Sequence, residues 1–206
     1  MNKDTATLLE QYFDTAFNAA DGIKKLRELI LTLAMQGKLV PQDPSDPPAS
    51  ELLKEIEAEK KRLVKEGKIK TPKPLPPVTE AEKPYELPQG WEWVRFPYCY
   101  YGIGSKSNQI QTSGYQESGT YPVIDQGKTF IAAYTDVKEL LLKLDKPVIV
   151  FGDHTKNIKY VDFDFIIGAD GVKTLCPYDS IASKFLFRLM QSYNLADRGY
   201  ARHFGV

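Results

Sequence analysis

Residues 105–112 form a polar stretch that contains no acidic side chain. Asparagine and glutamine carry a donor beside an acceptor and can bind adenine through two hydrogen bonds, whereas lysine binds guanine or phosphate. Serine and threonine hydroxyls can serve either partner. The stretch therefore predicts a nucleic-acid contact loop, with an ordinary solvated loop as the alternative. Its candidate residues are Ser105, Lys106, Asn108, Gln109, Gln111 and Thr112.

Two later stretches have a similar character. Residues 153–159 follow the apolar run 148–151, and a buried strand that opens into a polar loop is a common way to present contact residues. Residues 198–203 hold three potentially cationic side chains, for which a helix-terminal charge cluster is the alternative interpretation. We expect the amides to read bases and the lysines and arginines to contact phosphate. The added candidates are His154, Thr155, Lys156, Asn157, Lys159, Arg198, Arg202 and His203.

Catalytic chemistry finds little support in the residue pattern. Gly102 and Gly104 lack the third glycine and the following helix of a dinucleotide loop. Cys99 and Cys176 have no neighbouring histidine and stand in strand-like contexts, which favours buried structural thiols. Asp153 and His154 could be two metal ligands, but no further ligands accompany them at chelating spacing. We expect no catalytic residue, no metal and no cofactor.

Charge limits what a nucleic-acid surface can be. Lys plus Arg and Asp plus Glu both number 27, so the formal net charge is zero. A bulk electrostatic binder is excluded, and any such surface must be local and depend on base contacts or on partners. No apolar run is long enough to span a membrane, and the N-terminal residues do not form a signal peptide. With only two cysteines and no disulfide framework, we expect a cytoplasmic chain.

The N-terminal part of the sequence has the pattern of helices. Apolar residues spaced by three and four predict one long helix over residues 5–36, whose stripe needs a partner helix. Asp46 and Pro47 predict the start of a second helix over 47–66, and the short connection suggests an antiparallel hairpin. The stripe contains Leu9, Phe13, Ala16, Ala20, Ile23, Leu26, Ile30 and Leu33.

The rest of the chain changes in composition. Residues 71–90 hold six prolines and predict an extended, semi-rigid linker. Residues 91–206 predict an α/β body with a mainly antiparallel sheet and a helix over 180–192. The expected organisation is α+β: a helical hairpin or coiled-coil arm over 1–70, the linker over 71–90 and the body over 91–206. The expected strands are 91–96, 121–124, 129–134, 147–151, 158–161 and 172–176.

Several motifs resemble one protein family. The segment IKKLRELILTLAMQGKLVPQDP from Ile23, with PASELL from Pro48, resembles the end of a spacer helix in specificity (S) subunits of type I restriction–modification systems. LPQGWEWV from Leu87 resembles the start of a target recognition domain in these subunits. YPVIDQG from Tyr121, VFGDHT from Val150, VDFDF from Val161 and GADGVK from Gly168 resemble strand-and-loop patterns of such domains.

The resemblance implies a non-catalytic DNA-recognition subunit. It implies one target recognition domain, as in the N-terminal half of an S subunit, and therefore a reader of one half-site in double-stranded DNA. Implied partners are modification subunits, which methylate adenine, and through them restriction subunits; the helical arm could also self-associate. Two other functions remain open. An interaction scaffold would lack salt-dependent DNA binding, and a cysteine or metal hydrolase would depend on Cys99, Cys176 or His154.

Overall fold

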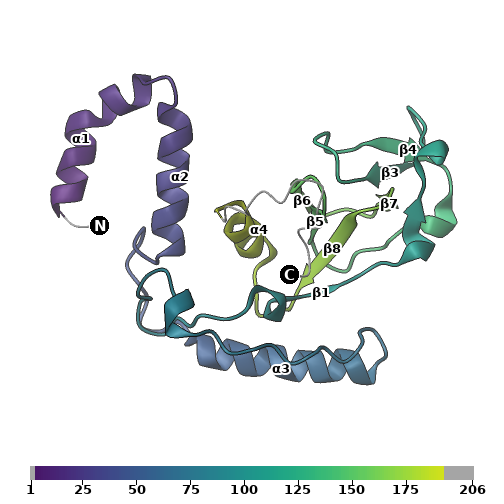
Figure 1. The fold of residues 1–206 in the computed structure, drawn as a ribbon, viewed down its shortest axis with the longest axis horizontal. Helices are drawn as coiled ribbons and strands as arrows, with labels where there is room; N and C mark the ends of the chain where they lie inside the picture. The colour runs from purple at the N-terminus through teal and green to yellow at the C-terminus, as the bar shows by residue number, and fades with distance from the viewer. Residues whose placement is uncertain (1–2, 193–206) are drawn as a thin grey trace. The chain divides into compact units, whose positions relative to one another are not determined.

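The computed structural model describes residues 3–192, and Figure 1 shows its ribbon. The chain divides into two compact units. The first contains the chain up to Glu55 together with Pro74–Arg95, and the second contains Ile56–Lys73 together with the chain from Phe96 onward. Within the described residues, no helix is both long and apolar enough to cross a membrane.

The predicted single helix over 5–36 is wrong. Two helices replace it, α1 (Lys3–Asn18) and α2 (Gly22–Met35), which lie side by side (Figure 1). The amide of Gly22 donates to the carbonyl oxygen of Ala19 at 2.9 Å and closes the turn between them. Asn18, Asp21 and Gly22 are poor helix formers, and folding back lets the two halves contact each other.

The proline-rich segment is held to the first unit by polar contacts. The Arg95 guanidinium donates to the carbonyl oxygens of Pro76 and Pro77 at 3.0 and 2.8 Å, and it binds both carboxylate oxygens of Glu82. The Trp91 indole N–H donates to the side-chain oxygen of Gln42 at 2.9 Å. A short 3-10 helix, η1 (Glu80–Glu82), interrupts the extended backbone.

Helix α3 (Ala49–Lys65) confirms the second predicted helix to within two residues at each end. It starts directly after Pro47-Pro48 and ends two residues before Gly67, whose φ of 70° allows Lys68 N to donate back to Leu63 O. Its Ile56 and Leu63 are buried in the second unit.

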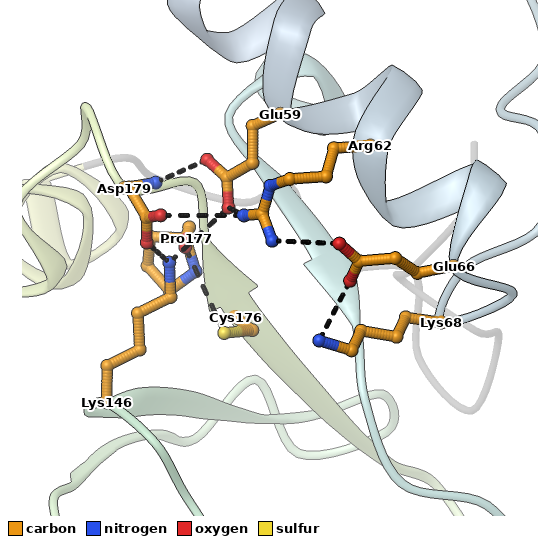
Figure 2. A network of polar contacts seen from close by, with 8 residues as sticks. All are labelled: Glu59, Arg62, Glu66, Lys68, Lys146, Cys176, Pro177 and Asp179. Atoms are coloured by element: carbon orange, nitrogen blue, oxygen red, sulfur yellow. Dashed lines mark hydrogen bonds and ion pairs between the residues drawn. The ribbon is translucent and has the colours of Figure 1, made fainter.

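Polar contacts also fix α3 within the second unit (Figure 2). The nearly buried carboxylate of Glu59 accepts a hydrogen bond from the amide of Asp179 at 2.7 Å and lies 3.8 Å from the ammonium group of Lys146. Lys146 also pairs with Asp179. One residue later in α3, the Lys60 ammonium lies 3.1 Å from the ring centroid of Tyr98. These charged groups are paired, as burial requires.

The second unit contains two four-stranded sheets, ordered β1-β8-β5-β6 and β2-β7-β3-β4. Every pair in the first sheet is antiparallel. In the second, β7 runs parallel to both β2 and β3, and β4 is antiparallel to β3. The strands are β1 (Tyr100–Gly102), β2 (Gln109–Ile110), β3 (Tyr121–Ile124), β4 (Ala133–Thr135), β5 (Val148–Gly152), β6 (Ile158–Val161), β7 (Ile166–Gly168) and β8 (Val172–Pro177).

Five of the six predicted strands correspond to strands β3, β4, β5, β6 and β8, but residues 91–96 form no strand. Instead the chain there is irregular and enters η2 (Phe96–Tyr98), another short 3-10 helix. Helix α4 (Ser183–Ser192) confirms the predicted C-terminal helix, and its Phe185 is 46% exposed. All five residues of β5 are buried, and Val148, Val150, Val161 and Phe165 belong to the main hydrophobic core.

Candidate nucleic-acid interface

Parallel pairing brings several strand ends to one edge of the second sheet. Strands β2, β7 and β3 run in the same direction, so the residues after each of them emerge at the same edge. These residues are 111–112, 169–171 and 125–126. The loop after β5 joins them because the amide of Asp153 donates to the carbonyl oxygen of Gly171 at 2.7 Å. Two of the three predicted polar stretches therefore meet here.

Gln126 connects these loops. Its side-chain amide donates to the carbonyl oxygen of Asp170 at 3.0 Å, and its side-chain oxygen accepts from the amide of His154 at 3.3 Å. Its own carbonyl oxygen accepts from the Thr155 hydroxyl at 2.6 Å and from the Asn157 amide group at 2.8 Å. One residue thus links the ends of β3, β5 and β7.

Two glycines allow the loops to approach Gln126. A Cβ on Gly152 would lie 2.2 Å from the Thr155 hydroxyl oxygen and 2.8 Å from Gln126 Cβ. At Gly171 a Cβ would lie 2.8 Å from the His154 ring and 2.9 Å from the Gln126 amide, and φ is 83°. Both the space and the backbone conformation at Gly171 therefore require glycine.

The first predicted stretch is divided by β2. Ser105, Lys106 and Asn108 precede the strand, where Ser105 caps the 3-10 helix η3 (Lys106–Asn108). Gln109 lies in β2, and Gln111 and Thr112 follow it, exposed at the edge that carries Gln126. The structure therefore brings only the second half of this stretch to the shared edge.

Two amides predicted to read bases are used inside the protein. The Asn108 side chain donates to the carbonyl oxygens of Leu140 and Leu141, both at 3.5 Å, and accepts from Ser105 N at 3.2 Å. The Gln109 amide donates to the carbonyl oxygen of Ala169 at 2.6 Å. Either amide must break these bonds to reach a base, whereas Gln111 stays exposed.

The loop after β5 is tightly turned. The amide of Lys156 donates to the carbonyl oxygen of Gly152 at 2.8 Å, and the amide of Gly152 donates to the carbonyl oxygen of Asn157 at 2.9 Å. Lys156 adopts a left-handed φ of 59°, which is uncommon for a residue with a side chain. His154 and Thr155 are exposed at the tip, and Asn157 is half-buried beneath them.

Lys159 does not lie on the surface where a phosphate contact was predicted. Its side chain is buried, and its ammonium group donates to the carbonyl oxygens of Asp125 and Thr129 at 2.7 Å each. The Asp125 carboxylate lies 3.6 Å away. Burial lowers the pKa of Lys159, and the Asp125 charge opposes that shift. Lys159 cannot reach phosphate without leaving these oxygens, because its side chain is buried and its ammonium group is bound to them.

Comparison with known proteins identifies the relatives of this chain. The EcoAI specificity subunit of a type I restriction enzyme from Escherichia coli is 36% identical over 205 residues, covering 90% of this chain and 34% of that protein. The EcoEI specificity subunit from Escherichia coli is 63% identical over 87 residues, which is 42% of this chain and 15% of that protein. This chain is a homologue of type I restriction specificity subunits.

The specificity-subunit homologue spans about a third of the length of the EcoAI subunit. The EcoR124I/EcoR124II specificity subunit from Escherichia coli is 35% identical over 81 residues, or 38% of this chain and 20% of that protein. No family model matches. A crystal structure of the HsdS subunit from Thermoanaerobacter tengcongensis covers 82% of this chain and 39% of that chain at a TM-score of 0.39 and 17% identity, too distant to guide the site.

The cysteines of this specificity-subunit homologue are buried and unpaired by disulfides. Burial raises the pKa of Cys99 to about 11 and also raises the pKa of Cys176. A thiol attacks as its thiolate, so both are poor nucleophiles at neutral pH. Across residues 3–192, no group of three or more metal-ligating side chains gathers. Arg198, Arg202 and His203 lie outside the described residues.

The residue that sequence reasoning missed is Gln126. It stands in the segment YPVIDQG, two residues after the end of a correctly predicted strand, but it was not proposed as a site residue. Gly171 was likewise part of GADGVK. Their position in the sequence could have indicated them. Each stands among polar or glycine residues just after a short apolar run, where a strand ends and a loop begins.

Proposed function

We propose that this chain is a DNA-recognition part of a type I restriction specificity subunit and that it reads one half-site. The observation that carries the proposal is the 36% identity to the EcoAI specificity subunit across 90% of the chain. The edge around Gln126 supports it, because exposed Gln111, Thr112 and His154 lie on loops that strand ends hold in place.

The proposed roles divide between bases and phosphates. Gln111 is the amide we assign to base reading, because it remains exposed while Asn108 and Gln109 bind carbonyl oxygens within the protein. Lys106 and Lys156 are assigned to phosphate, as are Arg198 and Arg202 beyond the described residues. Asn157 and Thr155 then act mainly by shaping the loop, since both bind Gln126.

In this proposal the chain itself is not a catalyst. Modification subunits would methylate adenine, and restriction subunits recruited through them would cleave, all in the cytoplasm. The helices of the first unit would form the arm that docks on the modification subunits or on a second copy. Exposed Phe13, Ile23 and Ile30, at 46, 47 and 43% of their surfaces, support such a contact because water would otherwise cover them.

The proposal can be tested in cells that carry the intact restriction system. Methylome sequencing with and without this subunit should show one bipartite adenine-methylated site that disappears when the subunit is deleted. Duplexes with that site, and with each half scrambled, then serve for binding by the assembled methyltransferase. Gln111→Ala should lose about 1–3 kcal/mol on the intact site and discriminate less between bases.

An interaction scaffold is the competing function. It predicts that deletion of the subunit leaves the methylome unchanged and that the assembled complex binds intact and scrambled duplexes equally at every salt concentration. The matched variant Gln116→Ala, an exposed glutamine on the same unit but before β3, should leave discrimination intact. If Gln111→Ala keeps full affinity and full discrimination, the assignment of this residue to base reading is wrong.

A further inference from the structure

The connection between β3 and β4 lies at the same edge as the loops around Gln126. It starts at Asp125, where the parallel strand β3 ends, and returns through Ile131 to β4. Its tip presents three exposed residues, Lys128, Thr129 and Phe130, the last with 44% of its surface exposed. None of them belongs to the polar stretches that the sequence singled out.

A buried cation closes this connection. The Lys159 ammonium group donates to the carbonyl oxygens of Asp125, before the tip, and of Thr129, within it, at 2.7 Å each. Only 6% of the Lys159 surface is exposed. Burying an ammonium group destabilises the folded state unless good partners replace the lost water. Here those partners are two backbone oxygens of one surface loop, one before its tip and one within it, so the charge serves to hold the shape of the loop.

Further contacts hold the same connection in place. Within it, Gly127 N donates to the Asp125 carboxylate at 2.8 Å, and Gln126 ties it to the neighbouring loops by binding the backbone at His154 and Asp170. The Phe130 ring packs edge-to-face against the Phe163 ring with 6.0 Å between centroids, and this contact helps to hold the Phe130 ring in place. The tip is therefore fixed in the same frame as Gln111 and His154.

We propose that Lys128–Phe130 is a DNA-contact element, with Lys128 binding a phosphate and Phe130 contacting the apolar edge of a base, and that Lys159 is the residue that positions it. The inference rests on the proposed function, because it assigns a further contact to the same DNA surface. A lysine beside an exposed aromatic ring suits DNA, since one binds the backbone of any sequence and the other packs against a thymine methyl group.

The test uses the assembled methyltransferase with two duplexes, one carrying the site found by methylome sequencing and one with this half-site scrambled. Lys128→Ala should weaken binding to both duplexes alike and lower the salt slope by about one. Phe130→Ala should weaken binding to the intact site by about tenfold and leave the scrambled duplex little changed. The two effects separate a phosphate contact from a base contact.

Matched controls come from α4, where Lys184 and Phe185 are neighbours of the same types and Phe185 is 46% exposed. The Ser183 hydroxyl donates to Pro147 O, which places this end of α4 beside the start of β5, opposite the Gly152 end. Lys184→Ala and Phe185→Ala should therefore bind both duplexes as the wild type does.

Lys159→Met tests the positioning role, because methionine fills similar space without the ammonium group. The variant should lose most of its preference for the intact site, and its binding to the scrambled duplex should weaken no more than in Lys128→Ala, since there a mispositioned tip loses at most the Lys128 phosphate contact. Its melting temperature is measured alongside, and if it does not fold, Lys128→Ala and Phe130→Ala decide. Wild-type discrimination by Lys159→Met would overturn its positioning role.

If Lys128→Ala and Phe130→Ala both bind the two duplexes as the wild type does, Lys128–Phe130 is not a DNA-contact element. A wild-type complex that binds the two duplexes equally would instead overturn the proposed function, before any variant is compared. The two failures are thus distinguishable.

Discussion

Gly171 is the position where a single methyl group should disturb the candidate site most. Its φ of 83° disfavours any residue with a Cβ, and that Cβ would meet His154 and Gln126 at 2.8 and 2.9 Å. We expect Gly171→Ala to lower the free energy of unfolding by about 1–2 kcal/mol for the backbone conformation and by about 1–3 kcal/mol more for the clash. Denaturant unfolding measures the sum.

Gly67 provides the matched control, since its φ is 70° but a Cβ there would meet nothing within 4 Å. Gly67→Ala should show the backbone cost alone. Equal losses of stability in the two variants would show that the loops around Gln126 yield freely, which contradicts a rigid site.

The positions of the polar loops were easier to predict than the contacts that their side chains make. Polar side chains were expected where polar loops were found, yet Asn108, Gln109 and Lys159 bind carbonyl oxygens of the protein itself. Near strand ends, some backbone carbonyl oxygens have no hydrogen-bond partner in the sheet. They therefore compete with any external ligand for side-chain donors. Which side-chain donor binds which carbonyl oxygen depends on the pairing of strands that are distant in sequence. That pairing cannot be predicted from composition.

At the scale of elements, local signals were predictive where they were unambiguous. Pro47 and Gly67 delimit α3, and β3 and β6 coincide with their predicted ranges. Strands β1, β2 and β7 are two or three residues long, too short for alternation to reveal them. The break between α1 and α2 was missed because an apolar stripe continues in register through Ala20 while the backbone turns.

The apolar side chains of α2 are expected to form an interface. Ile23→Lys with Ile30→Lys should abolish self-association or binding to modification subunits and leave the second unit folded, because a buried lysine in an interface costs several kcal/mol. Sedimentation and pull-down measure association, and circular dichroism follows folding. Both side chains are more than 40% exposed in this chain, so the change should cost little stability of its own.

Thr32 lies two residues beyond Ile30, about 200° around the helix, and is exposed. Thr32→Lys therefore adds one lysine to the opposite face, where the double variant adds two to the apolar face, and should associate normally. If the double variant also associates like the wild type, the apolar face of α2 is not an interface.

The proline-rich segment should respond to acid through Glu82. Hydrogen bonds from Arg95 and then from Thr79 lower the pKa of this carboxyl to about 2 from 4.5. A lowered carboxyl pKa stabilises the folded state fully above pH 4.5, and that stabilisation is lost as the pH falls through about 2. Arg95→Met should move the Glu82 pKa back toward 4.5, as measured by NMR titration of the side chain.

Lys83 pairs with Glu80 at 2.6 Å and has no such contact with Glu82, so Lys83→Met is the control. It removes one positive charge from the same segment and should leave the Glu82 pKa low. A Glu82 pKa near 4.5 in the wild type would show that the Arg95 contact does not persist in solution.

For the whole molecule, the absence of net charge limits how strongly it can hold DNA without help. Three exposed or half-buried lysines of the described structure are assigned to phosphate: Lys106, Lys128 and Lys156. Replacing all three by Ala in the assembled complex should lower the slope of log binding constant against log salt by about three. Titrations between low and physiological salt measure it.

An unchanged slope would place the phosphate contacts elsewhere in the assembly. The control replaces three other exposed lysines, Lys138, Lys143 and Lys184, and keeps the net charge of the two variants equal. Only the first set should alter the slope, because counterion release depends on where a charge sits and not on the total.

The hydrogen bonds that frame the candidate site have an evolutionary consequence. The acceptors are mostly backbone carbonyl oxygens, those of Asp125, Gln126, Thr129, Ala169 and Asp170. A carbonyl oxygen is the same in every amino acid, so substitutions at Thr129 or Ala169 leave its acceptor in place. New side chains at the loop tips can therefore be sampled one at a time on an unaltered scaffold, which makes a change of preferred sequence accessible through few mutations.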